Sequence, residues 1–187
     1  MKAIVYRPGE TALRLVERPE PTARTSDVLV RVAVSGVNPT DWKARRNAYA
    51  GTPTGVDLVP NQDGAGTIVA IGDGVAGHAV GDRVWLWESA WQRADGTAQE
   101  LVAIPADHAV TLPGTASFEL GASVGIPAIT AHRCLTVAED GPARLAPGTL
   151  AGRVVLVAGG AGAVGHAAIE LARWAGATVI ATVSNPE

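Results

Sequence analysis

One stretch of the sequence combines residue types and spacing that suit the two phosphates of a dinucleotide. From Arg153 to His166 an apolar strand pattern leads into Gly160-x-Gly162-x-x-Gly165 and then into a helical pattern. Glycines let the backbone turn tightly and approach phosphates, and a following helix N-terminus offsets their charge with free N–H groups and its dipole. We therefore predict a pyrophosphate site here. The candidate binding residues are Gly159, Gly160, Ala161, Gly162, Ala163, Val164 and Gly165.

The residues around this turn supply the elements that must position it. Gly176 stands where the C-terminal cap of the helix is expected, and residues 177–183 form a second strand pattern. Strand, turn, helix and strand together take about 30 residues, the length of one βαβ unit. This context favours a binding site over the alternative, a merely structural glycine-rich turn. The apolar residues at helical spacing are Val164, Ala167, Ala168, Leu171, Ala172 and Ala175.

A second segment has the same glycine spacing and serves as an internal control. Gly72-x-Gly74-x-x-Gly77 also follows a strand pattern, but the residues after Gly77 lead into the strand-like run 84–87. Without a helix N-terminus there is no group of free N–H donors to hold a phosphate. We therefore predict that this segment is a turn and binds no coenzyme.

Composition and charge exclude several classes of protein. The chain has 187 residues, enough for one large or two small domains, and a formal net charge of −3 that gives no electrostatic case for nucleic acid or an anionic membrane. The single cysteine, Cys134, rules out an intramolecular disulfide and a multi-cysteine metal site. The N-terminus reads as a strand and not as a signal peptide, and no apolar run approaches the roughly 20 residues of a membrane span. We expect a cytoplasmic protein.

The chain divides into a β-rich part and an α/β part. Residues 120–138 form a helical pattern with an interruption at Pro127, and the βαβ pattern follows it. We predict a β-rich domain over 1–121 and the start of a nucleotide-binding domain over 122–187. Because a two-stranded parallel sheet cannot cover both apolar faces, we expect further residues or another chain to complete it. The strands expected in the first domain cover residues 3–6, 13–17, 28–35, 65–71, 84–87 and 99–104.

Five segments along the whole chain carry a family resemblance. In this order they resemble the zinc-independent quinone oxidoreductase branch of the medium-chain dehydrogenase/reductase superfamily, which includes the zeta-crystallins. The resemblance implies an α/β fold: a GroES-like β-rich N-terminal domain, then the first βαβ unit of a Rossmann domain that is incomplete in this chain, with the nicotinamide in the cleft between the domains. The segments are Ser35–Lys43, Gly64–Gly72, Gly81–Val84, Ile126–Ala131 and Gly159–Gly165.

The same resemblance argues against zinc. The zinc alcohol dehydrogenases of the superfamily place a Cys where Asn38 stands and a His-Glu pair where Gln62 and Asp63 stand. The four histidines are scattered without metal-ligand spacing, so we expect no metal site. A quinone or an α,β-unsaturated carbonyl accepts hydride on carbon while charge spreads to a more distant oxygen, which hydrogen-bond donors can stabilise. The sequence therefore favours such an acceptor over a simple alcohol or aldehyde.

The end of the second strand bears on the choice of nicotinamide. An NAD site presents an Asp or Glu to the ribose 2′-OH, and Val183 stands where the resemblance puts that carboxylate. Without a negative charge a 2′-phosphate is tolerated, so we predict NADPH. Ser184 and Asn185 are candidate donors to that phosphate, or they are simply turn residues before Pro186.

The resemblance also implies the residues of the active site. Asn38, Asp41 and Lys43 would line the cleft near the nicotinamide, and Thr130 would approach it from the Rossmann side. Lys43 is either a hydrogen-bond donor to the developing enolate oxygen or a solvated surface lysine. Tyr49 either bounds the substrate pocket or lies on a loop surface.

These inferences predict an NADPH-dependent oxidoreductase that transfers hydride to a small-molecule quinone or enone without zinc. One alternative is a nucleotide-binding module without turnover, crystallin-like or regulatory, or an inactive fragment. A 2-alkenal or enoyl-thioester reductase would share every motif quoted above. The family also leads us to expect a homodimer in the full-length protein.

Overall fold

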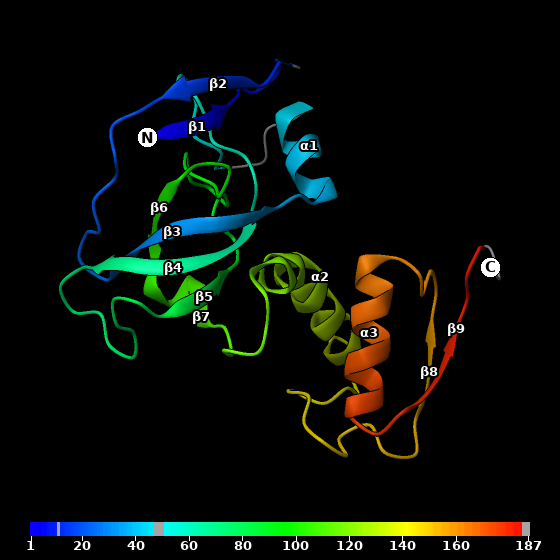
Figure 1. The fold of residues 1–187 in the computed structure, drawn as a ribbon. Coiled ribbons are helices and arrows are strands. Elements are labelled where there is room, and N and C mark those ends of the chain that lie inside the picture. The colour runs from blue at the N-terminus through cyan, green and yellow to red at the C-terminus, as the bar shows by residue number, and fades with distance from the viewer. Residues whose placement is uncertain (11, 47–50, 185–187) are drawn as a thin grey trace. The chain divides into compact units, whose positions relative to one another are not determined.

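The computed structural model describes residues 1–10, 12–46 and 51–184 (Figure 1). Its contacts divide the chain into two compact units, Met1–Ile126 and Pro127–Glu187. The division into domains 1–121 and 122–187 stays a prediction. The long helix α2 (Phe118–Thr136) begins in the first unit and ends in the second.

The first unit is built around a five-stranded antiparallel sheet with the strand order β6-β3-β4-β5-β7 (Figure 1). Its longest strand, β3, pairs on one side with β4 and on the other with β6. Two irregularities in the β3–β4 register, between Leu29 and Val30 and between Val32 and Val34, mark β-bulges. The strands are β3 (Asp27–Gly36), β4 (Asp63–Ile71), β5 (Arg83–Leu86), β6 (Leu101–Pro105) and β7 (Ala109–Thr111).

Alternating apolar residues form the hydrophobic core on one side of this sheet. Val28 and Val30 on β3 are completely buried, as are Val84 and Leu86 on β5. Residues two apart point to the same face of a strand, so each strand contributes one apolar row to one core. The cluster consists of Val28, Val30, Ile68, Val84, Leu86, Val102, Ile104 and Ala109.

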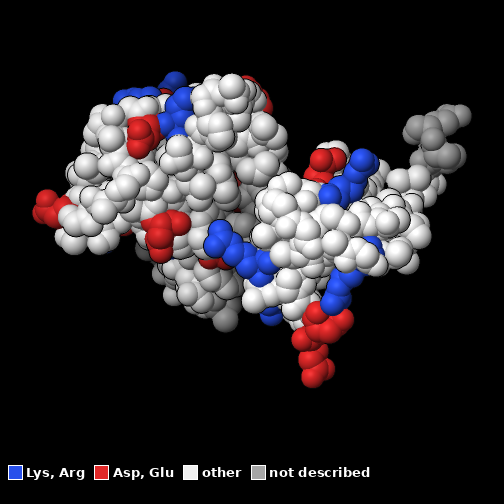
Figure 2. Space-filling view, turned by 90° about the horizontal axis from the view of Figure 1, so that it is seen from below, with Lys and Arg blue, Asp and Glu red and all other residues white. Residues whose placement is uncertain are grey.

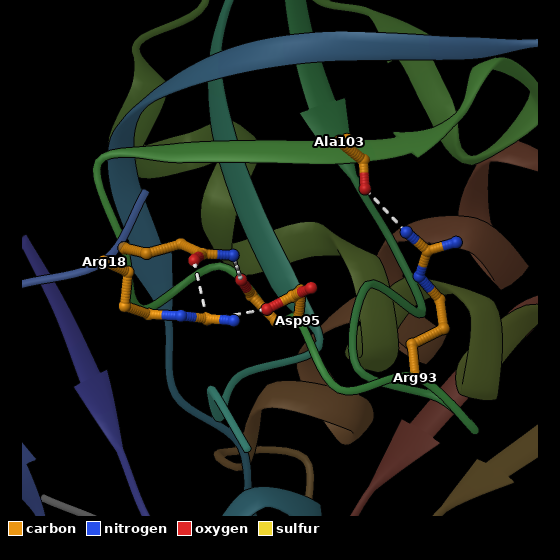
Figure 3. Close-up of polar contacts among 6 residues, drawn as sticks. Arg18, Arg93, Asp95 and Ala103 are labelled. Carbon is orange, nitrogen blue, oxygen red and sulfur yellow. Dashed lines mark hydrogen bonds and ion pairs between the residues drawn. The ribbon is translucent and has the colours of Figure 1, made fainter. Parts of the chain in front are cut away.

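A separate antiparallel pair, β1 (Lys2–Val5) and β2 (Arg14–Glu17), begins the chain. Side-chain bonds tie its end to the loop before β6 (Figure 3). The Arg18 guanidinium lies 2.7 Å from the Asp95 carboxylate, and the N-terminal amine donates to the Arg18 carbonyl. Arg93, in the same loop, donates to the Ala103 carbonyl on β6 over 2.6 Å.

All the strands expected in the first domain are present, with ends that move by one or two residues. The short strand β7, the 3₁₀ turn η1 (Ala106–His108) and helix α1 (Pro39–Arg46) were not predicted. The helix α1 eluded prediction because its residues are mostly polar and give no apolar stripe, while its signals are local ones at its first turn.

The second unit contains the predicted βαβ pattern. Strand β8 (Val154–Val157) and strand β9 (Thr178–Ala181) are parallel neighbours, and helix α3 (Ala163–Trp174) connects them and packs on them (Figure 1). Gly176, with a φ of +93°, ends this connection as expected. Ala168 of α3 packs against Val157 of β8 and Ala131 of α2.

The expected interruption of α2 at Pro127 is wrong, because the helix runs through that residue. Proline removes the hydrogen bond to the carbonyl four residues earlier, here that of Ser123. Ser123 is exposed, so water can take the place of the missing donor. Of the helices in the described part of the chain, none is long and apolar enough to cross a membrane.

Candidate functional site

The predicted pyrophosphate-binding turn lies directly between β8 and α3. Gly159 adopts the left-handed backbone region, with a φ of +71°, where a side chain would be strained. Its N–H group donates to the Thr182 hydroxyl oxygen, and the N–H of Gly160 donates to the Thr182 carbonyl over 2.8 Å. These bonds fix the turn to the residue that comes directly after β9. Thr182 is therefore a supporting residue that the glycine pattern alone did not reveal.

Two of the glycines allow this turn to close onto the helix. A Cβ at Gly165 would overlap the carbonyl oxygen of Gly159, and one at Gly160 would press within 3.0 Å of Ala181 and Ile169. Gly162 is different, because its nearest neighbour would be the Gly159 carbonyl oxygen at 3.4 Å. Gly160 and Gly165 thus serve packing, whereas Gly162 leaves open space at the helix N-terminus.

The N-terminus of α3 provides donors for an anion. Gly162 is the N-cap and makes no side-chain capping bond, and the first helical hydrogen bond runs from His166 N–H to the Gly162 carbonyl. The N–H groups of Ala163 and Val164 precede that bond, so the helix itself provides no acceptor for them. Both residues are exposed, as is Ala161. The turn therefore fits a dinucleotide pyrophosphate: its donors are accessible and the helix dipole favours negative charge.

The chain after β9 carries the residues considered for coenzyme choice. Val183 is 52% exposed and Ser184 is also exposed, so both are accessible to a ligand. Asn185 lies outside the described residues. Residues 178–184 contain no Asp or Glu, so this described segment offers no carboxylate to a ribose 2′-OH.

The second segment with the same glycine spacing is a turn, as predicted. It follows β4, Gly74 and Gly77 have φ values of +78° and +81°, and the chain continues into β5. Gly72 packs against the Arg24 carbonyl, where a Cβ would overlap. No helix begins in the described residues from 72 to 83, so the segment presents no helix N-terminus.

A compact polar network in the first unit brings together Asn38 and Asp41. Asn38 precedes Pro39 at the start of α1, and its N–H donates to the Asp41 carboxylate over 2.6 Å. The other Asp41 oxygen accepts the N–H of Gln62 over 3.2 Å. This is half of a capping box, with proline in its favoured first helical position. Burial raises the pKa of Asp41, and the two N–H donors partly oppose that effect.

Asp63 lies at the centre of the same network. It is 1% exposed, and its Oδ2 atom accepts two hydrogen bonds of 2.8 Å, one from the side-chain amide of Asn38 and one from the backbone N–H of Ile126. The pKa of Asp63 is raised from 3.8 to about 6, mainly because the carboxyl group is buried; the two donors oppose this rise, and the charge of Asp41 adds to it. Sequence reasoning compared Asp63 with a zinc-site residue but did not select it. Asp63 is the first residue of β4 and precedes the strand expected over residues 65–71, so the apolar pattern gave no signal for it.

The remaining predicted residues lie apart from this network or outside the description. The exposed side chain of Lys43 lies with its ammonium 5.6 Å from the centre of the Trp42 ring. Thr130 is an exposed residue of α2 in the second unit. Tyr49 lies outside the described residues. The structure therefore joins Asn38 and Asp41 through hydrogen bonds, whereas no contact joins Lys43 to them in the described residues.

The described residues contain no group of three or more His, Cys, Asp or Glu side chains that could hold a metal ion. Asn38 and Asp63 do meet, through a hydrogen bond of 2.8 Å. Their donor set is an amide and a carboxylate without thiolate or imidazole, which zinc sites ordinarily require.

Comparisons with known proteins identify a family that matches the first unit and a relative that is similar over most of the chain. Residues 24–114, which include the five-stranded sheet and α1, match the alcohol dehydrogenase GroES-like domain family. The quinone oxidoreductase of Mus musculus is 35% identical over 167 residues, which cover 89% of this chain and 46% of that protein.

Solved structures extend the likeness into the second unit. An alcohol dehydrogenase superfamily protein from Novosphingobium aromaticivorans superposes with a TM-score of 0.86 and 28% identity, covering 99% of this chain and 54% of that one. The quinone oxidoreductase of Thermus thermophilus, whose structure is also known in complex with NADPH, gives 0.77 and 31%, covering 100% and 54%. The chain thus spans about half the length of the relatives that it matches.

A GroES-like β domain followed by a partial Rossmann region defines the architecture of the medium-chain dehydrogenase/reductase superfamily. Within that superfamily, the chain belongs to the quinone oxidoreductase branch.

Proposed function

We propose that the protein is an NADPH-dependent reductase that transfers hydride to a quinone or an α,β-unsaturated carbonyl without zinc. The observation that carries the proposal is the open N-terminus of α3 behind the glycine turn, with Gly162 as an uncapped N-cap. A helix N-terminus with exposed N–H donors binds phosphate groups through hydrogen bonds and its dipole. In this proposal Ala161, Ala163 and Val164 contact the pyrophosphate, and Gly159, Gly160, Gly162 and Gly165 shape the turn.

The preference for NADPH rests on the region after β9. No carboxylate stands among the described residues there to repel a 2′-phosphate or to bind a 2′-OH. Ser184 and Asn185 are the proposed donors to the phosphate. The complex of the Thermus thermophilus relative with NADPH supports the same coenzyme. When bound, the reduced nicotinamide supplies the hydride.

The proposed reaction needs no zinc, because the first unit offers hydrogen-bond donors that suit the proposed acceptors. Reduction of an aldehyde concentrates charge on the oxygen of the reacting carbonyl, which calls for a Lewis acid or a positioned acid. Hydride addition to a quinone or enone places that charge on a more distant oxygen, where neutral or cationic hydrogen-bond donors suffice. The amide of Asn38 and the ammonium of Lys43 are donors of this kind.

The first unit provides the acceptor side of the proposed reaction. Asp41 holds the start of α1 through the backbone N–H groups of Asn38 and Gln62, which fixes the backbone from which the Asn38 side chain extends. Lys43 is the proposed donor to the developing enolate oxygen, and Tyr49 is proposed to bound the substrate pocket. Thr130 is proposed to contact the nicotinamide. Replacing Lys43 with Ala should lower turnover by about 100-fold, the contribution of a useful proton donor. A loss below about threefold would remove Lys43 from the mechanism.

Nothing in the visible charge distribution favours a polyanionic partner. Figure 2 shows the Lys, Arg, Asp and Glu side chains of the described residues scattered over the displayed face, with wide uncharged areas between them. This pattern and the net charge of −3 support a small-molecule substrate. The homodimer and the cytoplasmic location expected from the sequence stay predictions.

The decisive assay follows NADPH oxidation by the complete protein. That protein includes any residues that precede or follow the 187 residues of this chain. A panel of quinones, enones, 2-alkenals and enoyl thioesters would be offered as acceptors, with and without a strong zinc chelator. We expect quinone or enone reduction that the chelator leaves unchanged. Preference for a 2-alkenal or an enoyl thioester would assign the protein to those reductases, and coenzyme binding without turnover would make it a non-catalytic module. Activity that needs stoichiometric zinc would contradict the proposal.

A further inference from the structure

The buried carboxylate of Asp63 connects two parts of the first unit through one oxygen. Its Oδ2 atom accepts from the amide of Asn38, which precedes α1, and from the backbone N–H of Ile126 in α2, each over 2.8 Å. The other oxygen, Oδ1, is buried and has no hydrogen-bond partner among the described residues. The two hydrogen bonds of the Asp63 carboxylate among the described residues therefore both go to Oδ2.

Two glycines make this junction sterically possible. A Cβ at Gly125 would overlap Oδ1 of Asp63, and a Cβ at Gly36 would overlap the carbonyl oxygen of Ala122. Because neither glycine has a side chain, the first half of α2 approaches β3 and β4 closely enough for Asp63 to reach Ile126. The geometry therefore depends on residues from β3, β4 and α2.

The bond to Asp63 determines which polar atoms Asn38 can offer a ligand. A side-chain amide has two N–H donors and one carbonyl acceptor, and one N–H of Asn38 is taken by Asp63. Among the described residues this is the one hydrogen bond of the Asn38 side chain. The remaining N–H and the carbonyl oxygen are left with fixed directions, at a residue that is 8% exposed.

We propose that Asp63 is a positioning residue of this reductase: it holds the Asn38 amide against the first half of α2 and so orients the polar atoms that Asn38 presents to the reaction. This inference rests on the proposed function. It assigns Asp63 no contact with coenzyme or acceptor, and its effect passes through Asn38.

The ionisation of Asp63 gives this role a measurable signature. An ionised carboxylate accepts hydrogen bonds about twice as strong as those of a neutral group. The pKa of Asp63 is raised to about 6, mainly by burial, and Asp41 is the titratable group whose charge adds to that rise. Protonation would fall on the free Oδ1 and leave Oδ2 as a weaker, neutral acceptor. Turnover should therefore decline as the pH falls through about 6.

The test compares pH profiles of kcat for quinone reduction by the complete protein. Asp63→Asn keeps the shape and the carbonyl acceptor but stays neutral, so it should resemble the protonated protein at every pH. We expect kcat to fall roughly fivefold at neutral pH, with the decline near pH 6 abolished and KM for NADPH within about twofold. Asp82→Asn is the matched control, because Asp82 also accepts a backbone N–H, that of Ala79 over 2.8 Å, at an exposed turn. Its profile should equal that of the unsubstituted protein.

Gly125→Ala provides a second variant in case Asp63→Asn does not fold. Its Cβ would push α2 away from Asp63 without removing the carboxyl group, so kcat should fall. The acid decline should persist and move to higher pH, because the Ile126 donor that lowers the pKa of Asp63 is lost. An active protein whose profile is unchanged by Asp63→Asn, or whose kcat is unchanged by Gly125→Ala, would overturn the positioning role and leave the proposed function intact. Failure of the unsubstituted protein to reduce any quinone or enone would overturn the proposed function, and this role with it.

Discussion

The two segments with the spacing Gly-x-Gly-x-x-Gly differ in the element that each of them enters. Gly72 to Gly77 leave β4 and turn through positive φ angles toward β5, with no side chain near Gly74 or Gly77. Gly160 to Gly165 leave β8, bond to Thr182 and open α3. The spacing of glycines therefore does not define a phosphate site. The helix N-terminus that receives the turn does.

The largest expected effect comes from placing a carboxylate in each segment. Gly162→Asp should weaken NADPH binding about 100-fold, because the new charge would lie at the proposed phosphate site. Gly162 has an extended N-cap backbone, with φ −78° and ψ 160°, where Asp is a preferred residue, so the helix should lose no stability. Thermal unfolding and a fluorescence titration with NADPH would measure both quantities. In the matched variant Gly74→Asp, affinity within about twofold of the unsubstituted protein is expected. Equal losses in the two variants would contradict the comparison.

A Gly→Ala substitution in each segment should distinguish an effect on the free energy of unfolding from an effect on NADPH affinity. Gly165→Ala forces a Cβ onto the Gly159 carbonyl, which should cost about 1–3 kcal/mol of unfolding free energy and weaken NADPH at least tenfold. Gly77→Ala strains a residue at φ +81° by about 1–2 kcal/mol, yet the affinity should stay unchanged. Denaturant unfolding and coenzyme titration of both variants test this. If Gly165→Ala bound NADPH normally, close packing of the turn would be irrelevant to the site.

Val183→Asp should shift coenzyme preference by about tenfold toward NADH. A carboxylate there would repel a 2′-phosphate and accept a hydrogen bond from a 2′-OH. The ratio of kcat/KM for the two coenzymes measures the shift, and Val137→Asp is a control at another exposed valine of the second unit. An unchanged ratio in Val183→Asp would place the ribose elsewhere.

The smallest effect is expected for Ser184→Ala. Loss of one hydroxyl donor should weaken NADPH about threefold and leave NADH unchanged, since only NADPH carries the phosphate. Parallel titrations with the two coenzymes would separate these results. Equal weakening of both coenzymes would mean that Ser184 is a turn residue.

Much of the fold was predictable because strands and βαβ units leave local signals. The apolar runs of β3, β4 and β8 identified strands, and the small residues after Gly165 identified α3 with Gly176 at its end. Helix α1 left no apolar stripe, and continuity of α2 through Pro127 depended on the exposure of Ser123. Such outcomes follow from tertiary surroundings, which local patterns do not encode.

The glycine turn between β8 and α3 was predictable for the same reason, whereas the polar network was not. Gly159 to Gly165 are contiguous, so spacing and the following helix sufficed. Asp63 became recognisable only when strand pairing, the close approach of α2 at Gly36 and Gly125, and the burial of its carboxylate were known. Residues that act together across β3, β4 and α2 are scattered in the sequence, and the sequence contains no direct record of their contact.

The central claim is that a phosphorylated dinucleotide binds at the N-terminus of α3. Isothermal titration calorimetry of the complete protein with NADPH tests it most directly. The account predicts a saturable heat with one site per chain, strongly reduced in Gly162→Asp and retained in Gly74→Asp. No heat with NADPH or with NADH would contradict it.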